Sequence, residues 1–528
     1  MAKLKNYNGR YCESEYESAF IAFLESVGWH YLAGNQISRS YSEVLIAEDF
    51  KAFLAKTSPN LLPEETEQLY DTVRLAGAES DFATLHKVYK WMVDGVQFTP
   101  QNGLPVMVPL IDFETPENNI FRVVNQFTVE YINNGQRETR RPDVLLFVNG
   151  MPLCVIELKN PADAHATIYD AWEQITIRYW RDIPQLLHYC PLACISDGVK
   201  TRLGTVRTPY EHFYAWRRVN DGDKLSTMPF EETETMVRGV YAPERFLEIF
   251  RDYIYFQDEV FDCDEREIVC RYPQFFAARL LKQSIVKSVV EQTGKGGTYF
   301  GATGCGKTYT MAFLARQLSL RCGDVPQIGS PTIVMIVDRE ELQDQGIKLF
   351  AKSKEFLNLG DVSVVKDRKH LRQELGARES GGFYICTIQK FCDRKEDKIG
   401  LINDRHNIIC FSDEAHRTQL EHSRKIQFSK DADENMRAMV SKPYAKVLKE
   451  AFPHATFVGF TGTPIAETYQ TFGDEIDRYT MDQAVADGLT VSIKYHPRIA
   501  KVLLDTKKVK EIESYYKTCA DDGATEED

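Results

Sequence analysis

The sequence predicts an α/β protein with two unlike parts, an N-terminal domain on a mixed sheet and a second domain on a parallel sheet. Apolar segments at 143–148 and 153–158 are joined by Asn149-Gly150, a pair typical of tight β-hairpins. From about Tyr272 onward, apolar runs alternate with helical segments, as in a parallel sheet covered by helices.

Length and composition indicate several folded domains. At 528 residues with 43% hydrophobic residues, the chain can bury more than one core. We expect one domain over 1–240, a second over 241–480, and over 481–528 the start of a connection to a further domain, with an acidic tail.

Charge and apolar runs narrow the class of protein. The formal net charge of −13 argues against a generally basic nucleic-acid coat, although a local basic groove remains compatible with it. No apolar run approaches the length of a membrane span, and the first twenty residues do not resemble a secretory signal. With cysteines scattered without zinc-ligand spacing, we expect reduced thiols in a cytoplasmic protein without membrane contact.

Regular elements are expected throughout the N-terminal part. Helical spacing predicts a helix over 13–27, closed by Gly28, and mixed helices follow to about residue 96. Strands are expected within 120–131, before the hairpin, and a long helix over about 163–181. The polar segment 221–231 is expected to be a joint.

The hairpin carries a candidate metal site. Glu157 and Lys159 are two residues apart, so on a strand they share one face, while Asp143 stands at the open end of the partner strand. A strict two-residue turn would place Asp143 and Glu157 on opposite faces. A three-residue turn or a β-bulge would place them together, and we predict this shared face because only then can both carboxylates bind one Mg²⁺.

The chemistry expected of this site is metal-assisted hydrolysis. Two carboxylates hold Mg²⁺, and Lys159 beside it stabilises charge on an attacked phosphate. Three arginines upstream, Arg137, Arg140 and Arg141, are candidates for DNA phosphate contacts. The alternative is a strand with a solvated Glu and Lys, next to an exposed basic edge.

These residues resemble the PD-(D/E)xK nucleases, with Asp143, Glu157 and Lys159 at the motif positions. The resemblance implies a further acid from an early helix, for which Glu17 is the candidate; a solvated helix-start Glu is the alternative. Type I restriction subunits also carry a Gln and a Tyr four residues apart after the motif. Here Gln174 and Tyr179 are five apart, a departure from that pattern.

A nucleotide site is predicted in the second part. The segment 301–308 fits G-x-x-x-x-G-K-[ST], after an apolar strand and before a helical run. Backbone N–H groups of such a loop bind phosphates at a helix N-terminus. The residues expected to bind ATP are Gly301, Thr303, Gly304, Gly306, Lys307 and Thr308, with Thr308 also ligating Mg²⁺.

Two later segments complete the predicted motor. An apolar strand ends at Asp413-Glu414-Ala415-His416, where Asp413 is expected to hold Mg²⁺ and Glu414 to activate the attacking water. The segment 461–464 (Thr-Gly-Thr-Pro) again follows a strand. The alternatives are a helix cap and an ordinary loop.

The motif order resembles superfamily 2 helicases and translocases, and segments 337–345 and 387–391 resemble the restriction motors in particular. By the same resemblance Gln274 reads adenine; a surface Gln is the alternative. A PD-(D/E)xK domain followed by a RecA-like motor domain resembles the restriction (R) subunit of type I restriction–modification enzymes. That resemblance implies ATP-dependent translocation and cleavage of double-stranded DNA, with methyltransferase and specificity subunits as partners.

One departure is large, because only about sixty-four residues follow the 461–464 segment, too few for a second RecA-like domain. We expect ATP binding, but poor or absent hydrolysis and translocation by this chain alone. A nucleotide-binding DNA clamp active only with partners, and a helicase fragment without nuclease activity, are the alternatives. The domain order disfavours a type III restriction enzyme or a chromatin-remodelling-type ATPase.

Overall fold

The structure is a computed structural model that describes residues 13–77, 79–101, 103–160, 167–226, 231–257, 265–337, 350, 354–357, 362–391, 400–415, 426–430, 436–440, 444–492 and 514. The chain divides into a unit of residues 1–489 and a unit of residues 490–528, and only the first is described in detail. The acidic tail and the predicted motif residues Asp338, Arg339, Leu342, Gln345 and His416 lie outside the described residues.

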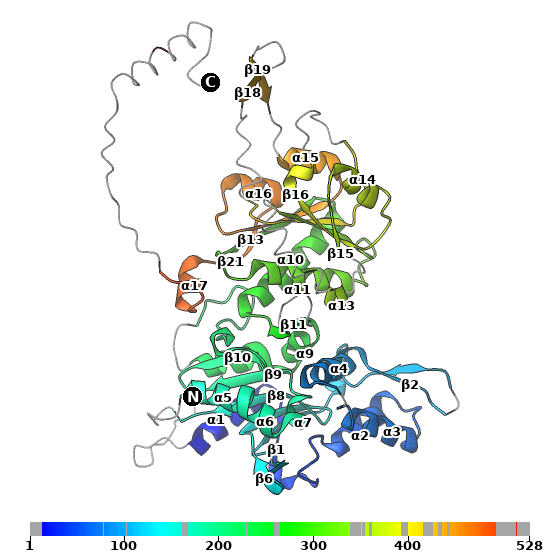
Figure 1. Ribbon diagram of the computed structural model, residues 1–528, viewed down its shortest axis with the longest axis vertical. Helices are drawn as coiled ribbons and strands as arrows, with labels where there is room; N and C mark the ends of the chain where they lie inside the picture. The colour runs from blue at the N-terminus through cyan, green and yellow to red at the C-terminus, as the bar shows by residue number, and fades with distance from the viewer. Residues whose placement is uncertain are drawn as a thin grey trace. The chain divides into compact units, whose positions relative to one another are not determined.

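A six-stranded mixed sheet forms the centre of the N-terminal part (Figure 1). Its strands, in spatial order, are β1 (His30–Ala33), β4 (Phe121–Asn125), β7 (Val144–Val148), β8 (Met151–Leu158), β9 (Leu192–Ser196) and β10 (Thr201–Thr205). The pairs β1/β4 and β8/β9 are parallel and the other neighbours are antiparallel. The predicted mixed sheet is therefore confirmed.

Helices and small ribbons surround this sheet. The helices are α1 (Glu13–Ser26), α2 (Ala47–Thr57), α3 (Pro63–Arg74), α4 (Asp81–Asp94), α5 (Ile168–Glu173), α6 (Trp180–Asp182) and α7 (Pro184–Leu187). The ribbons pair β2 (Val96–Phe98) with β3 (Val106–Val108) and β5 (Val129–Asn133) with β6 (Gln136–Arg140). Every residue of β7 and β8 is buried, which explains why both strands are apolar almost throughout.

Two expected elements differ in detail. The strand expected within 120–131 is two strands, because Gln126 has a left-handed backbone (φ 51°) that ends β4 before β5 begins. The helix expected over 163–181 begins at Ile168 among the described residues, and its middle, Gln174–Tyr179 (η3), is a π-helix. A sequence pattern with helical spacing does not reveal such a local widening.

A helical segment and a ribbon lead to the second sheet. They are α8 (Glu232–Met236), the π-helix η6 (Val237–Tyr241), α9 (Pro243–Asp252), β11 (Ile254–Gln257) and β12 (Arg266–Val269). At the N-terminus of α9, Pro243 occupies the first turn, where its missing N–H costs no hydrogen bond.

The second sheet has seven strands, all parallel, as the alternation of strands and helices predicted. In spatial order they are β15 (Val362–Val364), β16 (Phe383–Thr387), β14 (Thr332–Val337), β17 (Ile408–Ser412), β20 (Thr456–Thr461), β13 (Lys295–Gly301) and β21 (Glu475–Tyr479). The helices are α10 (Tyr272–Glu291), α11 (Lys307–Leu320), α13 (Lys354–Leu357), α14 (Arg368–Gly376), α15 (Tyr444–Ala451), α16 (Ala466–Phe472) and α17 (Met481–Ala486), and β18 (Ile426–Lys430) pairs with β19 (Met436–Val440).

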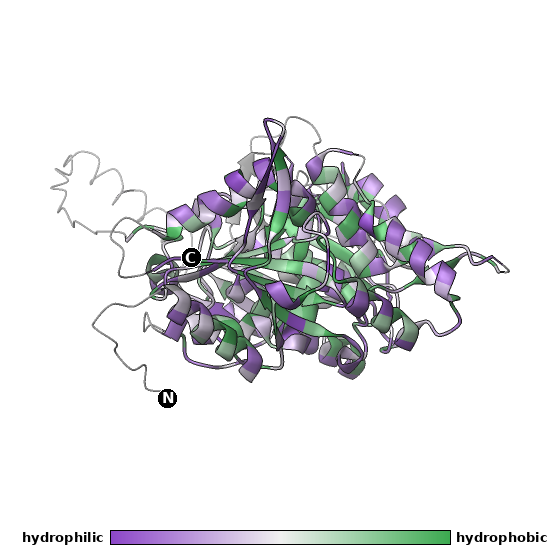
Figure 2. Ribbon diagram, turned by 90° about the horizontal axis from the view of Figure 1, so that it is seen from below, coloured by the Kyte–Doolittle hydropathy of each residue, from purple (hydrophilic) through white to green (hydrophobic). Residues whose placement is uncertain are grey.

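Alternate residues of the central strands face two hydrophobic cores. On β14, Ile333 and Met335 belong to the core that includes α10 and α11, whereas Val334 and Ile336 belong to the core that includes α14 and α15. Figure 2 shows hydrophobic residues concentrated on interior strands and hydrophilic residues on outer helix faces. A strand buried on both faces is apolar at nearly every position, which explains the continuous apolar run that follows Thr332 in β14.

The structure also bears on the expectations about membrane spans and cysteines. None of the helices in the described ranges is long and apolar enough to cross a membrane. The cysteines that the structure describes are free thiols and buried: Cys154, Cys190, Cys194, Cys270, Cys305, Cys322, Cys386 and Cys410.

Candidate functional site

The β7–β8 hairpin places Asp143 opposite Glu157. Asn149 and Gly150 both have positive φ (51° and 76°) and form a two-residue turn between the paired residues Val148 and Met151. The register then shifts by one residue beyond Phe147, so that Val144 pairs with Ile156. The predicted shared face is therefore confirmed, and it arises from a β-bulge rather than from a three-residue turn.

The two acids are in direct contact. The backbone N–H of Asp143 donates to Glu157 Oε1 (3.4 Å), and the N–H of Leu158 donates to Asp143 Oδ2 (2.9 Å). Glu157 is fully buried, and its Oε2 has no hydrogen-bond partner. Burial, and next the charge of Asp143, raise the pKa of Glu157 well above its ordinary value. The site therefore holds a buried carboxylate oxygen that is not compensated by a hydrogen bond.

A closed ring of polar contacts surrounds Glu157. Lys159 Nζ lies 3.8 Å from Glu157 Oε2 and donates to Gln174 Oε1 (3.0 Å). Gln174 Nε2 donates to the Tyr179 hydroxyl (2.8 Å), which donates to Glu157 Oε1 (2.6 Å). Gln174 is thus brought to the predicted motif residues. Tyr179 joins them too, although sequence reasoning noted it only as the partner of Gln174.

The π-helix explains the five-residue spacing of Gln174 and Tyr179. In a π-helix the hydrogen bonds run from i to i+5, so residues five apart lie close to one face, as residues four apart do in an α-helix. The π-helix spans Gln174–Tyr179. The departure from the family spacing is therefore compensated by the local backbone.

Glu17 lies in α1 but does not join these acids. It is buried, and its carboxylate accepts from Asn125 Nδ2 (2.6 Å) and Gln126 Nε2 (2.8 Å). Within the described ranges, no three His, Cys, Asp or Glu side chains are grouped so that they could hold a metal ion. The structure thus assembles Asp143, Glu157, Lys159 and Gln174, and places Glu17 one layer of contacts away.

The upstream arginines are only partly available to a ligand. Arg140 binds Asp182 (2.6 Å), and Arg181 contacts the same carboxylate. The side chain of Arg137 is 80% exposed, with Glu130 at 3.6 Å. Arg141 is exposed two residues before Asp143. Arg137 and Arg141 therefore remain the better candidates for a phosphate contact.

The phosphate loop runs from β13 into α11. Gly304 and Gly306 have positive φ (82° and 86°), a conformation that glycine adopts without strain. Lys307 is the first residue of α11; its Nζ donates to the carbonyl of Gly301 (3.2 Å) and lies 4.0 Å from Glu414 Oε1. Thr308 follows in the first turn. The N-terminus of α11 thus presents backbone N–H groups where an anion can bind.

The acidic pair meets this loop from β17. Asp413 follows the last residue of the strand, and burial, against the opposing effect of Lys307, raises its pKa to about 6. The backbone N–H of Glu414 donates to Asp413 Oδ1 (3.0 Å). The third segment also arrives here, because a Cβ on Gly462 would lie 3.2 Å from Thr303 Oγ1. Three motifs far apart in sequence are therefore neighbours.

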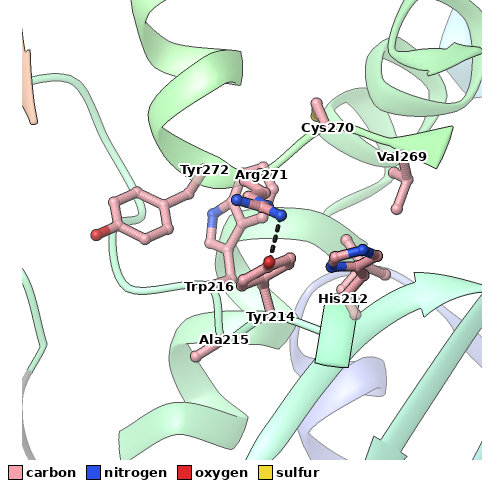
Figure 3. A pocket seen from close by; sticks show the side chains of 9 residues that line it. His212, Tyr214, Ala215, Trp216, Val269, Cys270, Arg271 and Tyr272 are labelled. Carbon is pink, nitrogen blue, oxygen red and sulfur yellow. Dashed lines mark hydrogen bonds between the residues drawn. The ribbon is translucent and has the colours of Figure 1, made fainter. Parts of the chain in front are cut away.

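Gln274 faces the phosphate loop from α10. It is buried; its Oε1 accepts from the backbone N–H of Arg271 (2.9 Å), and its Nε2 approaches the carbonyl of Gly306 (3.4 Å). Next to it, Arg271 stacks on the ring of Tyr214 (3.5 Å to the centroid) and donates to its hydroxyl (Figure 3). Arg271, Tyr214, His212 and Trp216 line a small cavity beside the segment that carries Gln274.

Two family models match the chain in this order. Residues 10–212 match the N terminus of type I restriction enzyme R proteins (HSDR_N), and residues 273–527 match the SWI2/SNF2 ATPase family. The nuclease-like site lies in the first range and the phosphate loop in the second. The domain order disfavours a chromatin-remodelling-type ATPase for the chain as a whole, but its ATPase part matches the SWI2/SNF2 model.

Curated relatives agree with these matches. The chain is 32% identical over 505 residues to the type I restriction enzyme HindI endonuclease subunit of Haemophilus influenzae, covering 92% of this chain and 46% of that protein. It is 28% identical over 546 residues to a protein assigned as the MjaIXP endonuclease subunit of Methanocaldococcus jannaschii, covering 97% and 48%. A fragment structure assigned to an HsdR subunit from Vibrio vulnificus matches with 16% identity and a TM-score of 0.25, covering 70% of this chain and 56% of that one.

The chain spans about half the length of the curated relatives that it matches. Within that span it combines the N-terminal domain of type I restriction R proteins, an ATPase domain of the SWI2/SNF2 type and identity over most of its length to endonuclease subunits. Over most of its length the chain is therefore homologous to the endonuclease (R) subunits of type I restriction enzymes, and it carries the N-terminal domain of R proteins followed by an ATPase domain of the SWI2/SNF2 type.

Proposed function

We propose that this chain performs Mg²⁺-dependent endonucleolytic cleavage of double-stranded DNA at Asp143, Glu157 and Lys159, and that it binds ATP at the loop before α11. The observation that carries the proposal is the pairing of Asp143 with Glu157 across the bulged hairpin, with Glu157 Oε2 lacking a hydrogen bond. A buried carboxylate oxygen that accepts no hydrogen bond is costly, and Lys159 Nζ, at 3.8 Å, is too distant to donate one, so a cation bound there would stabilise it.

The residues present fit a magnesium ion. Mg²⁺ prefers oxygen ligands and is commonly bound through one or two carboxylates while it keeps several waters, so a third acid is not required. Asp143 and Glu157 would hold it. Bound there, Mg²⁺ would polarise water and offset the charge that develops on the attacked phosphate.

The surrounding side chains have distinct proposed roles. Lys159, whose side chain is 13% exposed, would stabilise negative charge on the phosphate during attack. Gln174 fixes the ammonium group of Lys159, and Tyr179 fixes the carboxylate of Glu157. Both contacts come from the π-helix η3, which would therefore hold Lys159 and Glu157 in position before DNA binds.

We propose the ATP site from the contacts around the loop before α11. Lys307 would leave the carbonyl of Gly301 and bind the β- and γ-phosphates, while Thr308 and Asp413 would hold Mg²⁺. Glu414 would orient the attacking water. Gln274 would read adenine, since its amide has both a donor and an acceptor.

We also propose the partners and the location of the whole subunit. Because the relatives that match are endonuclease subunits of type I restriction enzymes, we infer that this chain acts in the cytoplasm with methyltransferase and specificity subunits. ATP-dependent translocation along double-stranded DNA belongs to the same proposal. The domain boundaries at about residues 240 and 480 stay predictions.

The direct test is metal binding by the purified chain. We expect calorimetric titration with Mg²⁺ to show a saturable site that is lost in Asp143→Asn and unchanged in Asp221→Asn, a matched substitution at an exposed residue. The two variants remove the same charge, so a general electrostatic effect would weaken both equally. Equal binding by Asp143→Asn and the unaltered chain would refute the proposed nuclease site.

A further inference from the structure

Both carboxylate oxygens of Glu17 accept hydrogen bonds from side-chain amides. Its Oε1 accepts from Asn125 Nδ2 and its Oε2 from Gln126 Nε2, at 2.6 and 2.8 Å, and the residue is only 9% exposed. A carboxylate can only accept hydrogen bonds, so it is the side chain that can satisfy two facing amide N–H groups at once. We call Glu17, Asn125 and Gln126 the amide clamp.

The amide clamp holds the backbone partner of Asp143. Gln126 leaves β4 with a left-handed backbone (φ 51°), a conformation that is costly for a residue other than glycine. Its N–H donates to the carbonyl of Asp143 (2.9 Å), and Asn125 pairs with Val144 in the neighbouring strand. A side-chain contact from α1 therefore fixes the turn that places Asp143.

The geometry argues against Glu17 as a metal ligand. Both of its oxygens already accept short hydrogen bonds, in contrast to Glu157, whose Oε2 has none. Glu17 is also not grouped with Asp143 and Glu157 in any three-residue ligand set of the described chain. A ligand role would require the amide clamp to open.

We propose that Glu17 is a positioning residue, which sets the orientation of Asp143 through Gln126 and does not bind the cation. The inference rests on the proposed function, in which Asp143 binds Mg²⁺. α1 would thus help to position Asp143 through the hydrogen bonds of Glu17, a role that the charge of this residue alone does not suggest.

A reciprocal exchange of donor and acceptor tests this assignment. In Glu17→Gln only one oxygen remains as acceptor, and the new N–H₂ group faces a donor, so we expect Mg²⁺ affinity to fall about tenfold. In the double variant Glu17→Gln/Gln126→Glu, the oxygen of residue 17 accepts from Asn125 and its amide donates to the new carboxylate. We expect this exchange to restore affinity to within about threefold of the unaltered chain.

Calorimetric Mg²⁺ titration distinguishes the outcomes. If Glu17 were a ligand, the exchange would not restore binding, because the carboxylate would have moved to residue 126; that result overturns the proposal. Gln126→Ala gives an independent measure should the double variant fold poorly. A positioning role predicts a loss like that of Glu17→Gln, whereas undiminished affinity contradicts it.

Controls separate this inference from the proposed function. Glu15→Gln, at an exposed position of the same helix, should leave binding unchanged. Thermal unfolding of each variant checks that the fold is intact. If the unaltered chain shows no site that Asp143→Asn removes, the proposed function fails and this inference with it; if that site exists and the exchange does not rescue it, only the role of Glu17 is wrong.

Discussion

At the scale of single residues, two lysines have separate chemical tasks. Lys159 contacts Glu157 and Gln174 in the N-terminal part, while Lys307 begins α11 and lies 4.0 Å from Glu414. Neither lysine contacts the other site in any hydrogen bond or ion pair that the structure shows. Substitutions at the two positions should therefore affect different activities.

Lys159→Ala should abolish DNA cutting while leaving ATP hydrolysis unchanged in a complex reconstituted with a full-length subunit and its partners. Removing one group that stabilises transition-state charge costs about 100-fold or more in rate. Cleavage of plasmid DNA and phosphate release are measured on the same samples, with exposed Lys200→Ala as the control. Loss of both activities would contradict two independent sites.

Lys307→Ala should weaken ATP binding by about tenfold or more, since the ammonium group would contact the β- and γ-phosphates. Mg²⁺ binding at Asp143 and Glu157 should persist. Fluorescent nucleotide titration measures the first and calorimetry without nucleotide the second, with Lys287→Ala on the exposed face of α10 as the matched variant. Unimpaired nucleotide affinity would show that the loop is not the ATP site.

At the scale of elements, two local irregularities create the nuclease-like site. The β-bulge in β8 brings Asp143 opposite Glu157, and the π-helix brings Gln174 and Tyr179 to one face. Both insert one residue into a regular element and so change which side chains point the same way. The regular hydrogen-bonding patterns of β8 and of the helix are thus interrupted at the residues that form the site.

Deleting Ile177 should preserve the site. Ile177 is 49% exposed within the π-helix, and its removal leaves Gln174 and the tyrosine four residues apart, which share a face in an α-helix. Insertion of one alanine after Ile177 is the contrasting variant, because it rotates the tyrosine away from Glu157. We expect Mg²⁺ affinity within a few-fold of normal for the deletion and a marked loss for the insertion. The reverse order would show that the π-helix itself is required.

At the scale of the whole unit of residues 1–489, buried ion pairs connect α9 to the helix that follows the phosphate loop. Asp252, at the end of α9, lies 2.8 Å from Arg321 and 3.8 Å from Arg316, both in or next to α11, and 3.1 Å from Arg251. Burial alone would raise the pKa of Asp252, but the arginines together outweigh it and the pKa lies below its ordinary value. The ionised form of Asp252 therefore stabilises the fold.

Asp252→Asn should lower the free energy of unfolding by about 3 kcal/mol at pH 7, because the buried Arg316 and the partly buried Arg251 and Arg321 lose their counter-charge. Since the pKa of Asp252 is depressed in the folded state, its contribution is present above the unfolded-state pKa of about 3.9 and is lost as the pH falls below it. Urea unfolding at pH 7 and near pH 3 measures the difference between the variant and the unaltered chain. A difference that does not shrink at the lower pH would contradict the role of the charge.

The sequence by itself determined the class of both sheets, the phosphate loop and the candidate residues Asp143, Glu157 and Lys159. These follow from local signals: apolar runs give strands, glycines with a lysine give a phosphate loop, and an Asn-Gly pair gives a hairpin. Such signals depend on neighbours in the chain, so they can be read without a fold.

Only the tertiary structure decided that a β-bulge places Asp143 and Glu157 on one face of the hairpin. It also decided why Gln174 and Tyr179 share a face, and what Glu17 contacts. Asn125 and Gln126 stand at the end of an apolar run, and nothing in the local sequence indicates which side chains they contact. Their importance arises because β4 lies beside β7 and α1 packs nearby. Contacts between segments more than a hundred residues apart depend on packing, and local sequence does not encode them.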